Sequence, residues 1–208
     1  MEKETAINLL ELGAVKLSPE NPYTWASGWK SPIYCDNRLT LSYPKIRKQI
    51  TNGLYTLVCN FFPGTTAIAG VATAGIPQGA LLADKMNLPF IYVRSKPKEH
   101  GMGNQIEGHL LPGSRVLIVE DLVSTGKSSL EAVEALRKAG AEVIGMVSIF
   151  TYGLEVAKSN FEKAEVRLAS LTNYSILLEA ALEAKYIDKS QLKALDQWKL
   201  SPETWRQG

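Results

Sequence analysis

From residue 66 to residue 171, short apolar runs alternate with segments long enough to form helices. The apolar runs are Thr66–Gly70, Phe90–Val93, Val116–Val119, Val143–Ile149 and Val166–Leu171. Helices are expected between them at Pro77–Met86, Lys127–Ala139 and Gly153–Lys163. Strands that are apolar throughout are typical of a parallel sheet whose two faces are both covered by helices. The pattern therefore predicts an α/β fold with a central, mostly parallel sheet flanked by helices.

The flanking regions extend this sheet without forming a second domain. Residues 14–40 contain short β-like pieces interrupted by prolines and a glycine, which predicts a small antiparallel hood. The remaining helices are expected at Glu2–Leu12, Ser42–Asn60, Thr172–Ala184 and Asp188–Trp198. Since no linker or internal repeat divides the chain, we interpret residues 1–208 as a single domain that carries the hood.

Composition argues against several classes of partner. The 23 basic and 21 acidic residues leave a net charge of +2, too small to predict binding to nucleic acid or to an acidic membrane surface. No apolar run approaches the roughly 18 residues that span a membrane, and Met1–Glu4 does not resemble the start of a secretory signal. Cys35 and Cys59 form no CxxC pair, so we expect unpaired thiols and a cytoplasmic protein.

The segment that follows Val116–Val119 is the richest in chemistry. Glu120 and Asp121 come directly after the strand, and the hydroxyl-rich stretch up to Ser129 then opens a helix. Ligands of open parallel sheets bind beyond the carboxyl ends of the strands. Loop amides and the helix N-terminus suit a phosphate, whereas the carboxylates suit sugar hydroxyls or a nearby divalent metal. The segment therefore predicts a site for a phosphorylated sugar.

Two other interpretations of this segment are weaker. Glu120 and Asp121 would also suit the start of a helix capped by Ser124 and Thr125, but a strand, an acidic pair and a glycine with four hydroxyl residues in succession favour a ligand site. Residues 126–128 match the end of the P-loop pattern G-x-x-x-x-G-K-[ST]. Its first position is Asp121, where a P-loop needs glycine, which argues against a nucleotide kinase.

Two further segments have the composition of anion-binding elements. The stretch Gly70–Gly75 contains only small residues, so its amides can approach an anion closely, although a tight turn would need the same residues. Residues 94–109 contain few large apolar side chains and suit a lid better than a core element, with a solvated hairpin as the alternative. His100 and His109 lie too far apart to match a zinc pattern.

Taken together, these segments resemble a known enzyme family. Residues 120–128 resemble the phosphoribosyl pyrophosphate (PRPP) motif of type I phosphoribosyltransferases. Trp25–Arg38, Gly70–Pro77 and Tyr92–Gly101 are similar, in order and spacing, to segments of the orotate phosphoribosyltransferase family. Members of that family use Mg2+ and convert orotate and PRPP into orotidine 5′-monophosphate and pyrophosphate. The resemblance implies the same reaction here, with the hood over the active site.

The resemblance also implies roles for individual residues. The catalytic residues would be Lys98, Glu120 and Asp121. The residues implied to bind PRPP are Thr73, Ala74, Arg94, Lys98, His100, Glu120, Asp121, Leu122, Val123, Ser124, Thr125, Gly126, Lys127 and Ser128. Those implied to bind orotate are Lys30, Tyr34, Arg38 and Ser124. No side chain is expected to bind Mg2+ directly, since PRPP and water would hold it. The lid residues would serve the neighbouring subunit's site, which implies a homodimer.

The chain departs from the common family pattern at three positions. Ala26 and Ala74 stand where lysines are common, and Tyr152 stands where an arginine often helps to bind orotate. The partner of the orotate carboxylate is therefore open among Lys30, Arg38 and backbone amides.

Two alternative functions use the same scaffold. The first is a phosphoribosyltransferase that acts on a purine base. The hood segment of residues 27–38 argues against it, because that segment favours orotate. A non-catalytic PRPP-binding regulator that also binds RNA is the other, and the near-neutral charge disfavours it.

Overall fold

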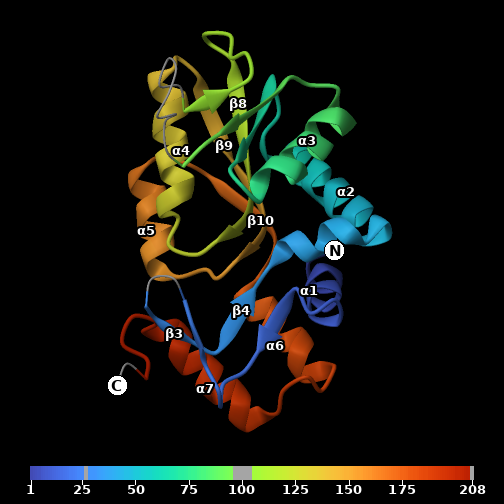
Figure 1. The fold of residues 1–208 in the computed structure, drawn as a ribbon, viewed down its shortest axis with the longest axis vertical. Coiled ribbons are helices and arrows are strands. Elements are labelled where there is room, and N and C mark those ends of the chain that lie inside the picture. Colours follow the sequence, from blue (N-terminus) through green and yellow to red (C-terminus); the bar gives the residue numbers. More distant parts are fainter. Residues whose placement is uncertain (26–27, 96–104, 207–208) are drawn as a thin grey trace.

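The computed structural model describes residues 1–25, 28–95 and 105–206 and is built around a six-stranded sheet (Figure 1). In spatial order the strands are β10 (Leu168–Asn173), β9 (Glu142–Thr151), β8 (Arg115–Val123), β5 (Ala67–Val71), β6 (Phe90–Val93) and β7 (Ile106–Glu107). All neighbouring pairs are parallel except β6 and β7. The predicted fold class, a mostly parallel sheet flanked by helices, is confirmed.

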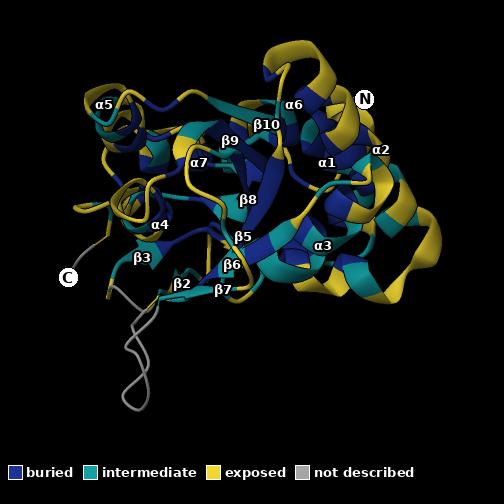
Figure 2. Ribbon diagram, turned by 90° about the horizontal axis from the view of Figure 1, so that it is seen from above, coloured by how far each residue is buried: buried dark blue, intermediate teal, exposed yellow. Residues whose placement is uncertain are grey.

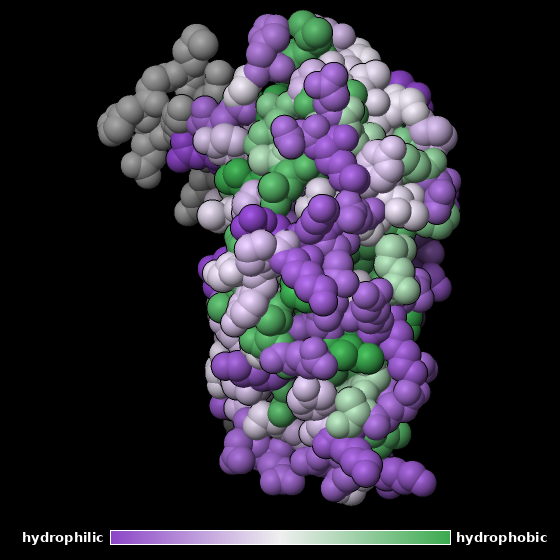
Figure 3. Space-filling model, turned by 90° about the vertical axis from the view of Figure 1, so that its right-hand side faces the viewer, coloured by the Kyte–Doolittle hydropathy of each residue, from purple (hydrophilic) through white to green (hydrophobic). Residues whose placement is uncertain are grey.

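Helices cover both faces of this sheet, as Figure 1 and the view from above in Figure 2 show. On one side lie α4 (Lys127–Lys138) and α5 (Glu155–Lys163), and on the other α1 (Glu2–Glu11), α2 (Pro44–Phe61) and α3 (Gly75–Met86). The side bearing α2 and α3 mixes hydrophobic with many hydrophilic residues (Figure 3). In the part of the chain that the structure describes, no helix has the length and apolar character needed to cross a membrane.

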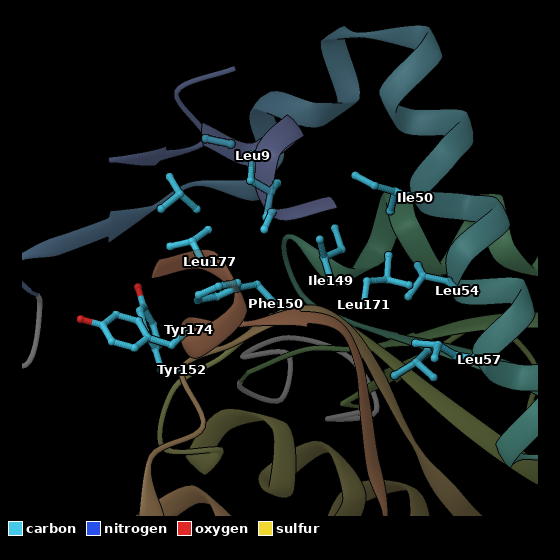
Figure 4. Packing of buried hydrophobic residues seen from close by; sticks show 14 of the residues in the cluster. Leu9, Ile50, Leu54, Leu57, Ile149, Phe150, Tyr152, Leu171, Tyr174 and Leu177 are labelled. Carbon is cyan, nitrogen blue, oxygen red and sulfur yellow. The ribbon is translucent and has the colours of Figure 1, made fainter. Parts of the chain in front are cut away.

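Alternate residues of the central strands β5 and β8 belong to two separate cores, which explains the continuous apolar runs of these strands. In β8, Leu117 and Val119 belong to the core under α1 and α2, whereas Val116 and Ile118 belong to the core under α4 and α5. Figure 4 shows part of the first core, in which Phe150 packs among leucines near the rings of Tyr152 and Tyr174. The rigid strands hold the residues that follow them at one edge of the sheet.

Residues 15–25 and 28–35 form two small antiparallel ribbons, as expected from their pattern. The strand β1 (Val15–Leu17) pairs with β4 (Ile33–Cys35), and β2 (Tyr23–Thr24) pairs with β3 (Lys30–Ser31). A 3₁₀ helix, η1 (Asn37–Ser42), leads from them into α2. The C-terminal helices α6 (Tyr174–Glu183) and α7 (Lys189–Leu200) follow β10. The indole of Trp198 in α7 donates to the carbonyl of Lys30, which ties the ribbons to the C-terminal region.

Several expected boundaries shift by one or two residues, and three differences bear on the site. The strand β8 continues to Val123, so Glu120 and Asp121 lie inside a strand rather than after it, because β9 pairs with β8 as far as Val123. The 3₁₀ turn delays the helix expected from Ser42 until Pro44. The end of the expected lid forms β7, where Ile106 packs against the second core, so this part is not a loop.

Candidate active site

The acidic pair combines an anchored carboxylate with a more accessible one. Glu120 is 6% exposed, and its Oε1 accepts a hydrogen bond from Ser129 Oγ at 3.1 Å. Asp121 is half-buried, and its backbone amide donates to Glu120 Oε2 at 3.2 Å. Burial, assisted by the charge of Asp121, raises the pKa of Glu120 to about 8, and burial also raises the pKa of Asp121. Such a pair favours ligands that donate hydrogen bonds or carry positive charge.

The turn from β8 into α4 offers unpaired amides beside these acids. Gly126 begins the helix with a left-handed φ of +77°, and no side chain caps the helix N-terminus. Lys127 and Ser128 are exposed, so the first turn of α4 is open to solvent. A phosphate at such a helix start meets free N–H donors and the positive end of the helix dipole. The geometry thus suits the phosphate-binding role expected of residues 124–128.

The helix α5 supports this turn from behind, which the sequence did not indicate. Asn160 Nδ2 donates to the carbonyl of Thr125 at 3.1 Å. The ring of Phe161 occupies the space beside Gly126, where an added Cβ would lie 2.5 Å from Phe161 Cε2. No local pattern marks these two residues, since the contacts join elements far apart along the chain.

The turn between β5 and α3 packs closely against β8. A Cβ on Gly75 would lie 2.4 Å from the carbonyl oxygen of Val119, and one on Gly70 would lie 2.8 Å from the carbonyl oxygen of Gly75. These glycines are therefore required by packing, whatever the turn binds. Thr73 is exposed and Ala74 is half-buried, and no side chain caps α3. The turn thus places backbone groups next to the strand that carries the acids.

A cavity of about 230 Å³ separates the N-terminal ribbons from the end of β8. It is lined by Thr24, Trp25, Tyr34, Cys35, Leu122, Ser124 and Tyr152. Two of the residues expected to bind orotate, Tyr34 and Ser124, thus meet across it. The aromatic pair in its wall is Trp25 and Tyr152, with ring centroids 5.1 Å apart. Sequence reasoning missed Thr24 and Cys35, and it assigned Leu122 to PRPP only.

The two expected cations lie outside the lining of this cavity. Lys30 Nζ donates to Thr24 Oγ1 at 2.9 Å, so it contacts a lining residue. Arg38 makes a two-pronged ion pair with Asp36, through Nε at 2.6 Å and Nη2 at 2.9 Å. Because that carboxylate already engages its guanidinium, Arg38 is less available to a ligand than Lys30.

The expected lid is only partly described. Arg94 lies at the end of β6, where its Nη1 is 3.4 Å from Glu107 Oε1 of β7. Lys98, His100 and, in the hood, Ala26 lie outside the described residues. The structure therefore leaves the roles expected of Lys98 and His100 as predictions.

The donor set near the acids fits a magnesium ion that is held mainly by substrate. Within residues 1–25, 28–95 and 105–206, no group of three or more acidic, histidine or cysteine side chains is arranged to hold a metal. Mg2+ commonly keeps several waters and binds one or two carboxylates together with substrate phosphates. Asp121 is the more accessible carboxylate next to the open turn, whereas Glu120 is buried and already accepts two hydrogen bonds.

A larger cavity of about 650 Å³ lies elsewhere, along α5 and the start of β10. Leu154, Ala157, Phe161 and Val166 are among its lining residues. It contains none of the residues expected to bind PRPP or orotate, so we assign the site to the smaller cavity and the adjoining acids.

Known proteins share both the fold and the segments that form this site. The phosphoribosyl transferase domain matches residues 42–176, which places the chain in that class of transferases. Orotate phosphoribosyltransferase of Cytophaga hutchinsonii is 54% identical over 204 residues, 98% of each chain. That of Porphyromonas gingivalis is 55% identical over 203 residues, 98% of this chain and 97% of the relative. This chain therefore belongs to the orotate phosphoribosyltransferase family.

A solved structure supports the same conclusion. The orotate phosphoribosyltransferase from Aeropyrum pernix superposes with a TM-score of 0.75 at 30% identity, over 88% of this chain and 99% of that one. The resemblance that the motifs indicated is confirmed.

Proposed function

We propose that this chain transfers the 5-phosphoribosyl group of PRPP to orotate, giving orotidine 5′-monophosphate and pyrophosphate in de novo UMP synthesis. The observation that carries the proposal is the continuity of the site: the acidic pair, the open start of α4 and the ribbon cavity all adjoin the end of β8. Leu122 and Ser124, which line the cavity, directly follow Asp121. A ribose held at the acids would therefore present its anomeric carbon to a base in the cavity.

The reaction breaks the bond between the anomeric carbon and pyrophosphate and forms a bond to a nitrogen of orotate. Its transition state resembles an oxocarbenium ion, so the protein acts mainly by positioning and by charge. The Asp121 carboxylate accepts hydrogen bonds from the ribose hydroxyls, while Ser129 holds Glu120 behind it. The negative charge of the Asp121 carboxylate favours the positive sugar. Residues 124–128 hold the 5′-phosphate through amides and hydroxyls.

The base would lie in the ribbon cavity, against Tyr34 and Ser124. Lys30 is the better placed cation for the orotate carboxylate, because its ammonium contacts Thr24 in the cavity wall. Tyr152 fills the position where an arginine is common with a buried ring, packed against Trp25, Phe150 and Trp198. That ring shapes an apolar wall of the cavity and supplies no positive charge.

Magnesium and the lid complete the proposal. PRPP oxygens and water would hold Mg2+ beside the acidic pair, and the ion would supply positive charge to offset that of the pyrophosphate. Thr73 and Ala74 offer backbone groups to the same anion. Arg94, Lys98 and His100 would neutralise pyrophosphate in the site of a partner subunit, which makes the working form a homodimer. We place the protein in the cytoplasm, and the free thiols of Cys35 and Cys59 support this.

The function is tested by following pyrophosphate release from PRPP and Mg2+ in the presence of orotate, adenine, hypoxanthine or uracil. Among the four bases, we expect only orotate to give pyrophosphate release. The Asp121→Asn variant serves as a control, and its turnover of orotate should be strongly impaired. Turnover with a purine and none with orotate would make the chain a purine enzyme. PRPP binding without turnover of any base would instead support the regulator.

Shared sites are tested by mixing subunits. Lys98→Ala and Asp121→Asn homodimers should each keep only a small, measurable residual activity, whereas a mixed dimer contains one site with both residues intact. We expect activity to return after subunit exchange. If exchange is demonstrated by mass and no activity returns, the lid serves its own subunit.

A further inference from the structure

The side chain of Asn37 joins the ribbons to the main chain of the acidic pair. Asn37 is 1% exposed at the start of η1, and its Nδ2 donates to the carbonyl oxygen of Asp121 at 2.7 Å. The two residues are 84 positions apart in the chain. Pairing of β8 with β5 reaches only Val119, so the acidic segment has a neighbouring strand on its β9 side only. Asn37 thus supports Asp121 beyond the end of β5.

A buried polar network fixes the orientation of the Asn37 amide. Cys35 Sγ donates to Asn37 Oδ1 at 3.3 Å, which leaves Nδ2 directed at Asp121. Thr40 Oγ1 donates to the Asn37 carbonyl at 2.6 Å, and Gln78 Nε2 in α3 donates to Thr40 Oγ1 at 3.4 Å. Both Thr40 and Gln78 are buried. Both ends of the Asn37 amide are paired, and breaking either bond would leave a buried group unpaired, which is costly and fixes the orientation of the amide. At the far end of the network, Gln78 Oε1 has no hydrogen-bond partner among the described residues.

The network joins the base cavity to the acidic pair and extends into the first turn of α3. Cys35 lines the cavity, and burial together with the charges of Asp121 and Asp36 raises the pKa of its thiol, which keeps the proton that Asn37 Oδ1 accepts. Gln78 is the fourth residue of α3, three positions after Gly75. Asp121 belongs to the acidic pair. The side-chain amide of Asn37 therefore lies between the base cavity and the acidic pair that would hold the ribose.

We propose that Asn37 is a positioning residue for phosphoribosyl transfer, acting through the main chain of Asp121. The inference rests on the proposed function and deepens it. Asn37 would not touch the reacting atoms. It would hold the Asp121 carboxylate in the orientation that the ribose hydroxyls require in the transition state. Because small displacements of a positioning group reduce rates steeply, its loss should lower kcat more than it changes KM.

The test is a double-mutant cycle between Asn37→Ala and Asp121→Asn, with kcat and KM measured for orotate and PRPP. In the wild-type background Asn37→Ala should lower kcat at least about tenfold, and in the Asp121→Asn background by less than about twofold, because coupled residues are not additive. An equal factor in both backgrounds would overturn the proposal. Asn37→Asp, which keeps the size of the side chain but removes the amide donor, serves if the alanine variant folds poorly, and the same outcomes apply.

Ser31→Ala is the matched control for loss of a buried polar group. Ser31 is buried in the same ribbons, and its hydroxyl donates to the Ile33 carbonyl without contacting Asp121. Both Ser31→Ala and Asn37→Ala should lower the free energy of unfolding in urea, but only Asn37→Ala should lower kcat. An equal kcat loss in both would reduce Asn37 to a structural role. The PRPP affinity of the same four proteins, measured by calorimetry, tests the coupling independently of turnover: Asn37→Ala should weaken PRPP binding less in the Asp121→Asn background than in wild type. If wild-type protein fails to turn over orotate, that failure counts against the proposed function alone.

Discussion

Replacing Gly126 with alanine should damage the phosphate-binding turn in two separable ways. The first is backbone strain: Gly126 has φ of +77°, and a left-handed conformation costs a residue with a Cβ about 1–2 kcal/mol. The second is steric, since the new Cβ would lie 2.5 Å from Phe161 Cε2 and 3.1 Å from Cδ2. Phe161 packs in the second core, so moving its ring disturbs that packing, and such overpacking costs about 1–3 kcal/mol. The free energy of unfolding should fall by about 2–5 kcal/mol in total.

The two contributions can be separated by a cycle with Phe161→Leu, followed by urea unfolding. A smaller side chain at position 161 removes the clash but leaves the strain, so Gly126→Ala should cost only about 1–2 kcal/mol in the Phe161→Leu background. In the wild-type background the displaced turn should also raise the KM for PRPP. If Gly126→Ala changes the unfolding free energy by less than about 0.5 kcal/mol, or by the same amount in both backgrounds, the packing argument is refuted.

Three further predictions concern the same framework. The pKa of Glu120 is raised from 4.5 to about 8, so the stability that this group contributes is fully present below pH 4.5 and is lost as the pH rises to 8. Relative to Glu120→Gln, the unfolding free energy of wild type should therefore fall by up to about 1.4 kcal/mol per pH unit across that window, and a constant difference would contradict the shift. Gly75→Ala should lower the melting temperature and abolish activity, because the added Cβ would lie 2.4 Å from the Val119 carbonyl oxygen. A variant that melts at the wild-type temperature would show that α3 can move to accommodate the Cβ. Asn173→Ala removes the acceptor for the Ile176 amide at the start of α6, so the free energy of unfolding in urea should fall by about 1 kcal/mol. The KM for PRPP should not change, because this cap has only a structural role.

The order of strands and helices could be predicted because it depends on local periodicity. A strand buried on both faces is mostly apolar, and β5, which is apolar and buried at all of its positions, shows this directly. The ends of strands were less predictable where hydrogen bonding to a neighbouring strand decides them. Glu120 and Asp121 interrupt the apolar run of β8, yet the strand continues because β9 supplies hydrogen-bond partners as far as Val123.

The candidate site divides in the same way. The acidic pair and hydroxyl turn are contiguous, so their chemistry and their resemblance to a family were visible in the sequence. The cavity that brings Tyr34 to Ser124, the support of the turn by Asn160 and Phe161, and the bond from Asn37 to Asp121 were not.

The sequence by itself therefore determined the class of sheet, the family and the segment that would hold the phosphorylated sugar, because each depends on neighbouring residues. Only the tertiary structure decided which distant side chains surround that segment and how deeply Glu120 is buried. Burial and long-range hydrogen bonds arise when elements pack together, and no local spacing of residues encodes which surfaces will meet.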